Sequence, residues 1–266
     1  MSNHNDPARS MLRYLFSHPL TQDIPLDDPR IVPLRAKIVK EKRFLYHIYY
    51  QWYQMILNHL PTGFLPVVEL GTGPGFLKEL LPALFTSDIV PCASVDVILD
   101  GQALPFQNAS LRAIVMVDVL HHLQNPRSFF LSASRTIQVG GCVLMVEPWY
   151  TTWSHWVYTH LHHEKFDPAC LEWELDTTKP LSSANGALPW ILFSRDLGQF
   201  SREFPNWKVE FIQPMMPLVY LLSGGFSSRL SPPGWSYSLC QVIEKVLSPL
   251  NPYLGMFALI RLRRLA

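Results

Sequence analysis

Short apolar runs follow one another between residues 64 and 148, and stretches with helical spacing separate most of them. The runs read FLPVVEL, LFTSDIV, SVDVILD, AIVMVDV and CVLMVEP, and each is long enough for one β-strand. Apolar strands that alternate with helices are typical of a mainly parallel sheet covered on both faces, because such strands have no solvated side. The pattern therefore predicts an α/β fold for this part of the chain.

Two helices are predicted between these strands. The first spans 76–81, and the second runs from Pro126 to Ile137. Asn125 is a typical N-cap residue, and proline is favoured at the first helical position, so the start of the second helix is well defined. We expect the pair Gly140–Gly141 to end that helix before the fifth strand begins.

Helical spacing also marks the first part of the chain. Residues 1–60 are interpreted as an N-terminal helical arm with a break rich in proline and aspartate at 23–33. Within the arm, the segment RFLYHIYYQWYQMILNHL carries one apolar stripe, formed by Leu45, Tyr49, Trp52, Ile56 and Leu60. We expect this stripe to cover one edge of a main domain that spans 61–266.

Composition narrows the class of protein. The 266 residues are 48% hydrophobic, which is enough for one large α/β domain with a sizeable core. The formal net charge of +1 gives no general attraction to nucleic acid. The four cysteines lie far apart without a CxxC pair, which favours a reducing cytoplasm over a disulfide framework or a zinc knuckle. Neither a secretory signal nor a membrane span is expected from the pattern of apolar residues.

Three glycines and an acid follow the first predicted strand, in ELGTGPG. Glu69 stands at the strand end. The glycines Gly71, Gly73 and Gly75 open the next helix, at the edge of the sheet where α/β proteins bind ligands. Missing side chains let the backbone approach a ligand, and the acid suits an ammonium group better than a pyrophosphate. Phe76 replaces the third glycine of the dinucleotide fingerprint GxGxxG, so a nicotinamide oxidoreductase is disfavoured.

Four segments occur in the same order as in one enzyme superfamily. They are ELGTGPG at 69–75, DGQALPF at 100–106, VDVLHHLQNP at 117–126 and VGGCVLMVEP at 139–148. Together they resemble the class I S-adenosylmethionine-dependent methyltransferases, and among these the type-11 subgroup that includes the ubiquinone and menaquinone methyltransferases. The flanking segments SHWVYTHLHHEKFDP and LLSGGF resemble a narrower set of bacterial methyltransferases.

This resemblance implies both a fold and a cofactor. The fold would be a Rossmann-like, doubly wound, seven-stranded sheet, mostly parallel with an antiparallel last strand, together with the N-terminal arm and a lid inserted at about 149–205. WKVEFIQPMM and YLGMFALIRL suit the sixth and seventh strands. The cofactor would be S-adenosylmethionine, held by Glu69, Gly71, Thr72, Gly73, Gly75, Asp88, Asp100, Gly101, Gln102, Asp118 and His121.

An acid at the end of the second strand accepts both ribose hydroxyls in this superfamily, since a carboxylate offers two adjacent acceptors. Asp88 and Asp96 are the candidates. We expect Asp88 to hold the ribose, because it ends an apolar run at the usual distance from Gly71, whereas Asp96 falls within the predicted third strand. The link IVPCAS is shorter than the helix usual there, and a turn-capping role for Asp88 stays open. Asp100 would accept from the adenine amino group.

Methyl transfer to a hydroxyl requires alignment with the sulfonium and removal of one proton. His163 and Glu164, in HWVYTHLHHEKF after the fifth strand, are the leading pair for this role. His122, in VLHHL after the fourth strand, is the competitor on the opposite wall. Packing of a polar helix side and of a turn are the alternatives for these residues. The spacing matches no strong metal motif such as HExxH, so no metal is expected.

The surroundings of the cleft indicate the class of acceptor. Residues 149–235 hold seven of the eight tryptophans, PMMPLVYLLSGGF is strongly apolar, and the sequence ends in IRLRRLA. An apolar cleft with a basic edge suits a small-molecule acceptor or a lipid-linked or glycan-type acceptor, and hence a cytoplasmic protein with peripheral membrane contact. Ordinary core packing explains the same residues. We expect O-methylation; the alternative is a catalytically silent cofactor-binding or scaffold protein with the same fold.

Overall fold

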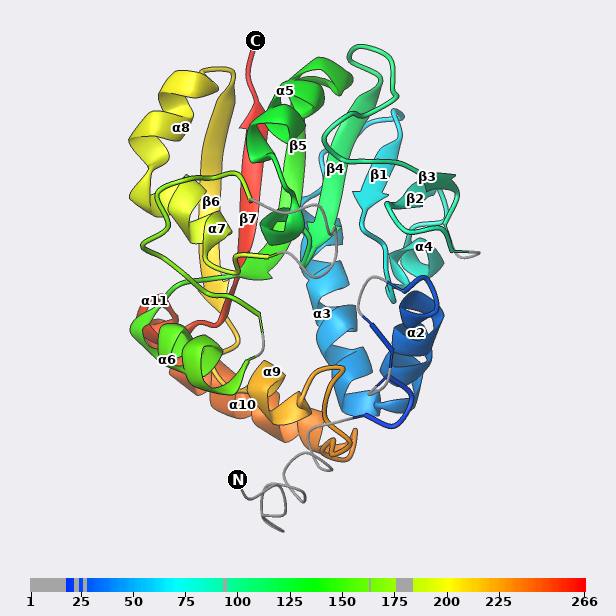
Figure 1. Ribbon diagram of the computed structural model, residues 1–266, viewed down its shortest axis with the longest axis vertical. Coiled ribbons are helices and arrows are strands. Elements are labelled where there is room, and N and C mark those ends of the chain that lie inside the picture. Colours follow the sequence, from blue (N-terminus) through cyan, green and yellow to red (C-terminus); the bar gives the residue numbers. More distant parts are fainter. Residues whose placement is uncertain (1–17, 22–23, 26–27, 93–94, 163, 176–183) are drawn as a thin grey trace, which may run out of the picture.

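A seven-stranded sheet forms the centre of the molecule, and helices cover both of its faces (Figure 1). The computed structural model describes residues 18–21, 24–25, 28–92, 95–162, 164–175 and 184–266. The strands are β1 (Val67–Leu70), β2 (Leu84–Asp88), β3 (Val97–Ile98), β4 (Leu111–Val117), β5 (Ile137–Pro148), β6 (Trp207–Met215) and β7 (Phe257–Arg264). Their order is β3-β2-β1-β4-β5-β7-β6, and β7 is antiparallel to both of its neighbours. The predicted doubly wound sheet with an antiparallel last strand is therefore confirmed.

Helices precede, connect and follow these strands. The longer ones are α2 (Ile31–Glu41), α3 (Arg43–His59), α5 (Pro126–Thr136), α6 (Thr152–Leu161) and α10 (Ser236–Leu247). The shorter ones are α4 (Leu77–Leu80), η1 (Leu120–His122), α7 (Leu188–Trp190), η2 (Ile191–Arg195), α8 (Leu197–Glu203), α9 (Val219–Ser223), η3 (Ser248–Leu250) and α11 (Asn251–Leu254). In the part of the chain that the structure describes, none of these helices combines the length and the apolar character that a membrane crossing requires.

Alternate residues of the central strands pack on opposite faces of the sheet. Val67 and Val115 belong to the core on the side of α3. Val68 and Ile114 belong to the core on the side of α5, η2 and α8. All four side chains are almost completely buried. Because both faces are covered, the strands read as nearly continuous apolar runs.

Helix α3 of the N-terminal arm packs on a face of the sheet (Figure 1), whereas the stripe alone suggested that it covers an edge of the main domain. The predicted stripe on α3 is buried at Leu45, Tyr49, Trp52 and Ile56. Trp52 anchors it, because its Nε1 donates to Met216 Sδ at 3.1 Å and its ring lies 5.0 Å from that of Phe257. A second described helix of the arm, α2, begins at Ile31, inside the predicted break.

The glycine pair before the fifth strand serves a different purpose from the predicted one. The predicted N-cap is confirmed, since the Asn125 side chain accepts from the Ser128 amide, but β5 begins at Ile137 directly after α5. Gly140 lies inside β5 with a φ of +82°, where the register against β4 shifts. A Cβ at Gly141 would lie 2.6 Å from the Arg112 carbonyl oxygen. The glycines therefore permit a β-bulge where β4 approaches closely, and they do not end the helix.

Other elements also differ from the boundaries that the sequence predicts. β3 has only two residues, so Asp96 precedes the strand and does not lie within it. In the second half of the predicted lid, Phe193 and Phe200 pack edge-on against Phe130 of α5, which makes this segment part of the core. The segment between β6 and β7 contains α9, α10, η3 and α11, helices that the sequence analysis did not predict.

Removing the Trp52 side chain should destabilise the fold strongly. We expect Trp52→Ala to lower the free energy of unfolding by about 3–5 kcal/mol, because a completely buried indole leaves a cavity between α3 and the sheet. Tyr50→Ala on the same helix is the control, since Tyr50 is 40% exposed and its loss should stay within about 0.5 kcal/mol. Urea unfolding of both variants measures the difference, and equal losses would contradict the assignment.

Candidate active site

The sheet has its switch point between β1 and β4, because the chain leaves β1 toward β2 on one side and later enters β4 on the other. A cavity of about 970 Å³ lies at the carboxyl ends of these strands. The turn after β1, the ends of β2 and β4 and the loop after β3 form one side of it, and residues of α2, α3, α6 and α9 form the other. Ligand pockets usually span about 300–1,000 Å³, so this cavity has room for a cofactor and a second ligand.

The turn after β1 has two glycines in the left-handed region. Gly71 has a φ of +61° and Gly73 a φ of +48°, and both line the cavity. A Cβ at Gly71 would lie 2.6 Å from the Val119 side chain, whereas a Cβ at Gly73 would meet only one backbone oxygen, at 3.7 Å. Gly75 differs, because it does not line the cavity and its Cβ would collide with Tyr53 of α3. Its missing side chain allows helix packing and does not admit a ligand.

Glu69 and Thr72 lie behind this turn and not in the cavity wall. Glu69 is buried, and its Oε2 accepts from Thr72 Oγ1 at 2.9 Å. Burial is the main cause that raises the pKa of Glu69 to about 8, and Asp88 adds to it. Near neutral pH the carboxyl therefore retains its proton until a cation comes close.

The two candidates for the ribose contact lie in different surroundings. Asp88 is buried at the end of β2 and lines the cavity. Its Oδ2 accepts from the Gly73 amide at 3.0 Å, and its Oδ1 accepts from the Val90 amide at 3.0 Å. Asp96 instead pairs with Lys78 at 2.5 Å and accepts from the Thr86 amide at 2.9 Å, outside the cavity. Asp88 thus combines the predicted location with the turn-capping role that the sequence left open.

The loop after β3 brings Asp100, Gly101 and Gln102 to the cavity, as the resemblance implies. The Asp100 carboxylate accepts from the Gln102 amide at 2.9 Å and from the Gln102 side chain. Gln102 Oε1 in turn accepts from the Asn125 amide at 2.7 Å. The loop is therefore held in place by the N-terminus of α5.

Asp118 and His121 follow β4 in a strained turn. Asp118 has a φ of +63°, which is uncommon for a residue with a Cβ, and its carboxylate faces the cavity. His121 is completely buried behind it, and its Nδ1 donates to Glu147 Oε2 at 2.7 Å. Glu147 Oε1 accepts from the amides of Val119 and Leu120 at 2.9 and 2.7 Å. One buried carboxylate therefore fixes both the turn and the ring.

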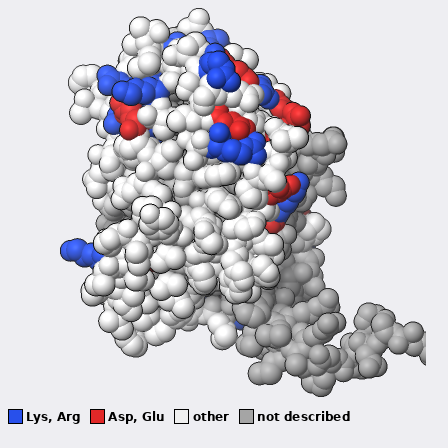
Figure 2. All heavy atoms as spheres, turned by 90° about the vertical axis from the view of Figure 1, so that its left-hand side faces the viewer, with Lys and Arg blue, Asp and Glu red and all other residues white. Residues whose placement is uncertain are grey.

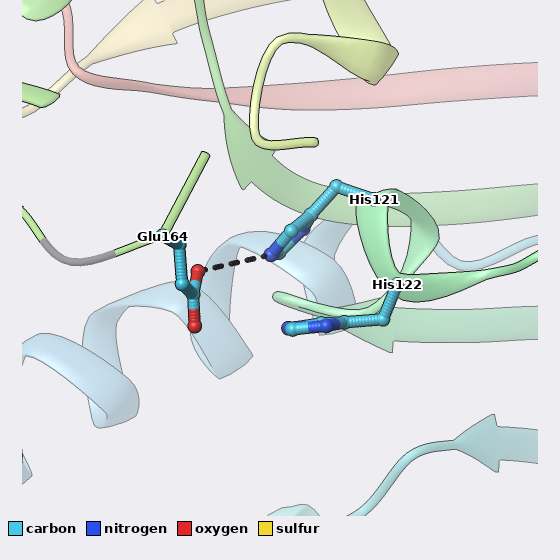
Figure 3. A group of neighbouring side chains, drawn as sticks. All are labelled: His121, His122 and Glu164. Carbon is cyan, nitrogen blue, oxygen red and sulfur yellow. Dashed lines mark ion pairs between the residues drawn. The ribbon is translucent and has the colours of Figure 1, made fainter. Parts of the chain in front are cut away.

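The other side of His121 faces Glu164 (Figure 3). Its Nε2 lies 3.7 Å from Glu164 Oε2 and 4.0 Å from Asp118 Oδ1. The His122 ring lies 4.2 Å from the His121 ring, and both His122 and Glu164 line the cavity. α6 ends at Leu161, so Glu164 reaches the cavity from a loop and not from the predicted helix. His163 lies outside the described residues.

Burial and charge oppose one another in this cluster. Burial by itself would lower the pKa of His121, but the Glu147 hydrogen bond and the Glu164 carboxylate together raise it well above its ordinary value. Burial opposes the ionisation of Glu164, but the His121 imidazolium outweighs it and lowers the pKa of Glu164. Burial raises the pKa of Asp118 to about 7, although His121 opposes this rise. The cluster thus contains an ion pair and one carboxyl that titrates near neutrality.

Tertiary structure adds groups that the sequence did not single out. Glu147 ends the fifth strand in VEP, and only its position at a strand end could have drawn attention to it. Arg35 of α2 lines the cavity with its guanidinium 5.2 Å from the Phe226 ring. The C-terminal arginines do not form the predicted basic edge, because Arg261 and Arg263 pair with Glu210 on β6, outside the cavity wall.

Glu69 should make the stability of the protein depend on pH. The folded state binds its proton more tightly than the unfolded chain, so this group's contribution is fully present below about pH 4.5 and is lost as pH rises toward 8. We expect Glu69→Gln to match the wild type near pH 5 and to be more stable near pH 8, with a divergence of at most about 1.4 kcal/mol per pH unit. Thermal melts across this range measure it; parallel curves would show that the carboxyl is ionised throughout.

Comparison with known proteins identifies a matching family model and solved structures with the same fold. A family model described as a methyltransferase domain, Methyltransf_11, matches residues 68–145, which run from β1 into β5 and include the glycine turn. A comparison with curated proteins gave no match.

Solved structures share the fold at low sequence identity. Geranyl diphosphate C-methyltransferase from Streptomyces coelicolor A3(2), in complex with Mg²⁺, geranyl diphosphate and S-adenosyl-L-homocysteine, is 14% identical with a TM-score of 0.53 over 95% of this chain and 90% of its own. A SAM-dependent methyltransferase from Thermotoga maritima is 16% identical with a TM-score of 0.51, over 85% and 94%. A methyltransferase in complex with the Haloferax volcanii Trm112 activator is 13% identical with a TM-score of 0.51, over 87% and 98%. Residues 68–145 therefore match a methyltransferase domain, and together with the shared fold this match supports an S-adenosylmethionine-dependent methyltransferase.

Proposed function

We propose that the protein methylates a hydroxyl of a partly apolar acceptor, either a small molecule or a lipid-linked or glycan-type molecule, inside the 970 Å³ cavity. One observation carries the proposal: the glycine turn and the Asp118–Glu164 cluster line the same cavity. The remaining wall is mostly apolar, with Val157, Leu161 and Leu221 among its residues. Such a lining fits an aliphatic acceptor that carries a polar group at the reacting end.

The cofactor would occupy the side of the cavity formed by strand ends. Gly71 and Gly73 would face its methionine part, and Glu69 behind the turn would ionise in response to its ammonium group. Asp88 would exchange its backbone partners for the ribose hydroxyls or share them. Asp100, with Gly101 and Gln102 beside it, would meet the adenine. This placement leaves the sulfonium near Asp118, at the junction with the acceptor side.

The acceptor side would supply alignment and one base. The cofactor would supply an activated methyl group: the acceptor oxygen would bond to its carbon while the carbon–sulfur bond breaks, and a neutral thioether would leave. The hydroxyl proton would pass to Asp118, whose pKa of about 7 suits a base near neutrality. Glu164 and His122 would orient the acceptor, while Glu147 and His121 hold the turn that carries Asp118. His163 retains its predicted role only as a sequence-based expectation.

A proton, and not a metal ion, would balance the charges in this cluster. His121, His122 and Glu164 offer ligand atoms within 4.8 Å of one another, which is close enough to hold an ion. However, both ring nitrogens of His121 face carboxylates, and these raise its pKa. A protonated ring fits that arrangement. The silent alternative, a protein that binds the cofactor without turnover, remains an outcome of the turnover experiment below.

Cofactor affinity should separate Asp88 from Asp96. We expect Asp88→Ala to weaken binding of S-adenosylhomocysteine by about 1.5–3 kcal/mol, the scale of hydrogen bonds to a charged group. Asp96→Ala should leave affinity nearly unchanged and lower stability instead, because its carboxylate ties Lys78 to β2. Titration calorimetry measures the affinities, and the reverse ranking would place the ribose at Asp96.

Turnover should depend on Asp118 with a defined pH profile. With methyl-labelled S-adenosylmethionine and a lipid extract as the acceptor source, we expect wild-type label transfer to rise as pH passes through about 7, since the base must lose its proton. Asp118→Asn should reduce transfer at least 10-fold and flatten this profile. Glu164→Gln and His163→Ala should reduce transfer while cofactor affinity stays within about 3-fold, as roles in positioning the acceptor require.

Two controls accompany this experiment. The same assay with a water-soluble extract distinguishes a small-molecule acceptor from a lipid-linked one. Treatment with a chelator should leave methyl transfer unchanged. If the chelator abolishes activity and an added divalent cation restores it, a metal ion and not a proton balances the charges in this cluster. Tight cofactor binding without transfer in either extract would favour the silent alternative.

A further inference from the structure

Helix α10 presents its apolar stripe to solvent. Leu239, Val242, Ile243 and Val246 follow the i, i+3, i+4, i+7 spacing of one helix face, and they are 60%, 61%, 45% and 74% exposed. A surface helix normally turns such a stripe toward the core. The inward side of α10 instead carries buried Tyr237 and half-buried Glu244, whose carboxylate accepts from the amides of Leu218 and Val219.

The stripe continues beyond the helix at both ends and onto its neighbours. Trp235 precedes it and Tyr253 follows it, and both are at least 70% exposed. Exposed Leu222, Trp156 and Leu161 extend the apolar surface toward α9 and α6. We name this surface the α10 face, comprising Trp156, Leu161, Leu222, Trp235, Leu239, Val242, Ile243, Val246, Leu250 and Tyr253. Exposed apolar surfaces of this extent mark sites of interaction.

The α10 face is nearly without charge. Figure 2 shows this side of the molecule: acidic and basic residues gather on its upper part, and the lower part is almost free of them. α6, α9, η3 and α11 contain no Asp, Glu, Lys or Arg, and α10 contains Glu244 and Lys245. Because Glu244 is engaged at the start of α9, the charge left to the surface of α10 is that of Lys245.

We propose that the α10 face docks the protein on the surface of an anionic lipid bilayer. A helix with an apolar stripe, aromatic residues and a basic residue lies in the plane of a membrane interface, with its apolar side among the lipid chains. Trp156, Trp235 and Tyr253 are the amphipathic rings that such an interface favours, and Lys245 complements acidic headgroups. A second copy of the chain would fit less well, since a symmetric contact would bury two Lys245 side chains in surfaces whose one carboxylate, Glu244, is already engaged at the start of α9.

The α10 face also adjoins the cavity. Leu161 belongs to both the face and the cavity wall, and Leu221, next to exposed Leu222, lines the cavity as well. Docking would therefore bring the acceptor side of the cavity to the lipid surface. This part of the inference rests on the proposed function, because it identifies the acceptor as a molecule anchored in the bilayer.

Vesicle flotation of the full-length protein tests the docking. We expect the wild type to float with vesicles of phosphatidylcholine and phosphatidylglycerol, and less with phosphatidylcholine alone. The variant V242E/V246E should lose at least 10-fold in bound fraction, since both side chains are exposed and their replacement leaves the core intact. L131E/V139E is the matched control, because these two apolar residues are each 63% exposed outside the α10 face.

Each outcome has a defined meaning. Retained S-adenosylhomocysteine binding shows that the variants fold. A wild type that does not float, or a control that loses binding equally, would overturn the proposal. A dimer seen by light scattering without lipid, and split by V242E/V246E, would overturn it in favour of a second copy. Flotation without methyl transfer would leave the docking proposal intact and contradict only the proposed function. Methyl transfer without flotation would support the proposed function and contradict the docking.

Discussion

The buried carboxylate of Glu147 connects the carboxyl ends of β4 and β5 beside the cavity. It is the next-to-last residue of β5 and accepts three hydrogen bonds from the turn after β4, two from backbone amides and one from the His121 ring. A buried carboxylate without such partners would be strongly destabilising, so the turn and the strand end stabilise one another. The consequence for the site is geometric. Asp118 is held with a positive φ, and His121 is held where its second nitrogen faces Glu164.

This arrangement spreads one positive charge among three carboxylates. His121 lies between Glu147 and Glu164, with Asp118 next in reach. Glu147 accepts a hydrogen bond from the ring and Glu164 forms an ion pair with it, and Asp118 becomes the group whose ionisation is least supported. A buried polar network of this kind gives carboxyl groups of similar ordinary pKa different acid strengths. The same sheet edge carries Glu69, a second carboxyl that burial keeps protonated until a cation arrives.

The helices between β6 and β7 lie between the cavity at the sheet edge and the surface of the molecule. α9 lines the cavity, and α10 covers α9 while turning its apolar stripe outward. The wall of the cavity and the exposed apolar face are therefore two sides of one small layer of helices. Such a layer would suit a lipid-anchored acceptor. The reacting group of the acceptor would enter the cavity on one side of the layer while its tail stays in the bilayer on the other side.

Local chemistry is what the sequence determined by itself. The strand runs and the N-cap Asn125 depend on neighbouring residues, and the structure has them where the pattern predicts, except that β3 has only two residues. The glycine turn after β1 also depends on local conformation, with Gly71 and Gly73 in the left-handed region. Tertiary structure decided what each feature meets. The missing side chain of Gly75 leaves room for Tyr53, and that of Gly141 leaves room for the Arg112 carbonyl. Both contacts join segments that are far apart in the sequence. The stripe of α10 shows most clearly what periodicity leaves undecided. The spacing of apolar residues tells which side chains share a helix face, but only the packing of the whole chain decides whether that face is buried in the core or exposed to solvent.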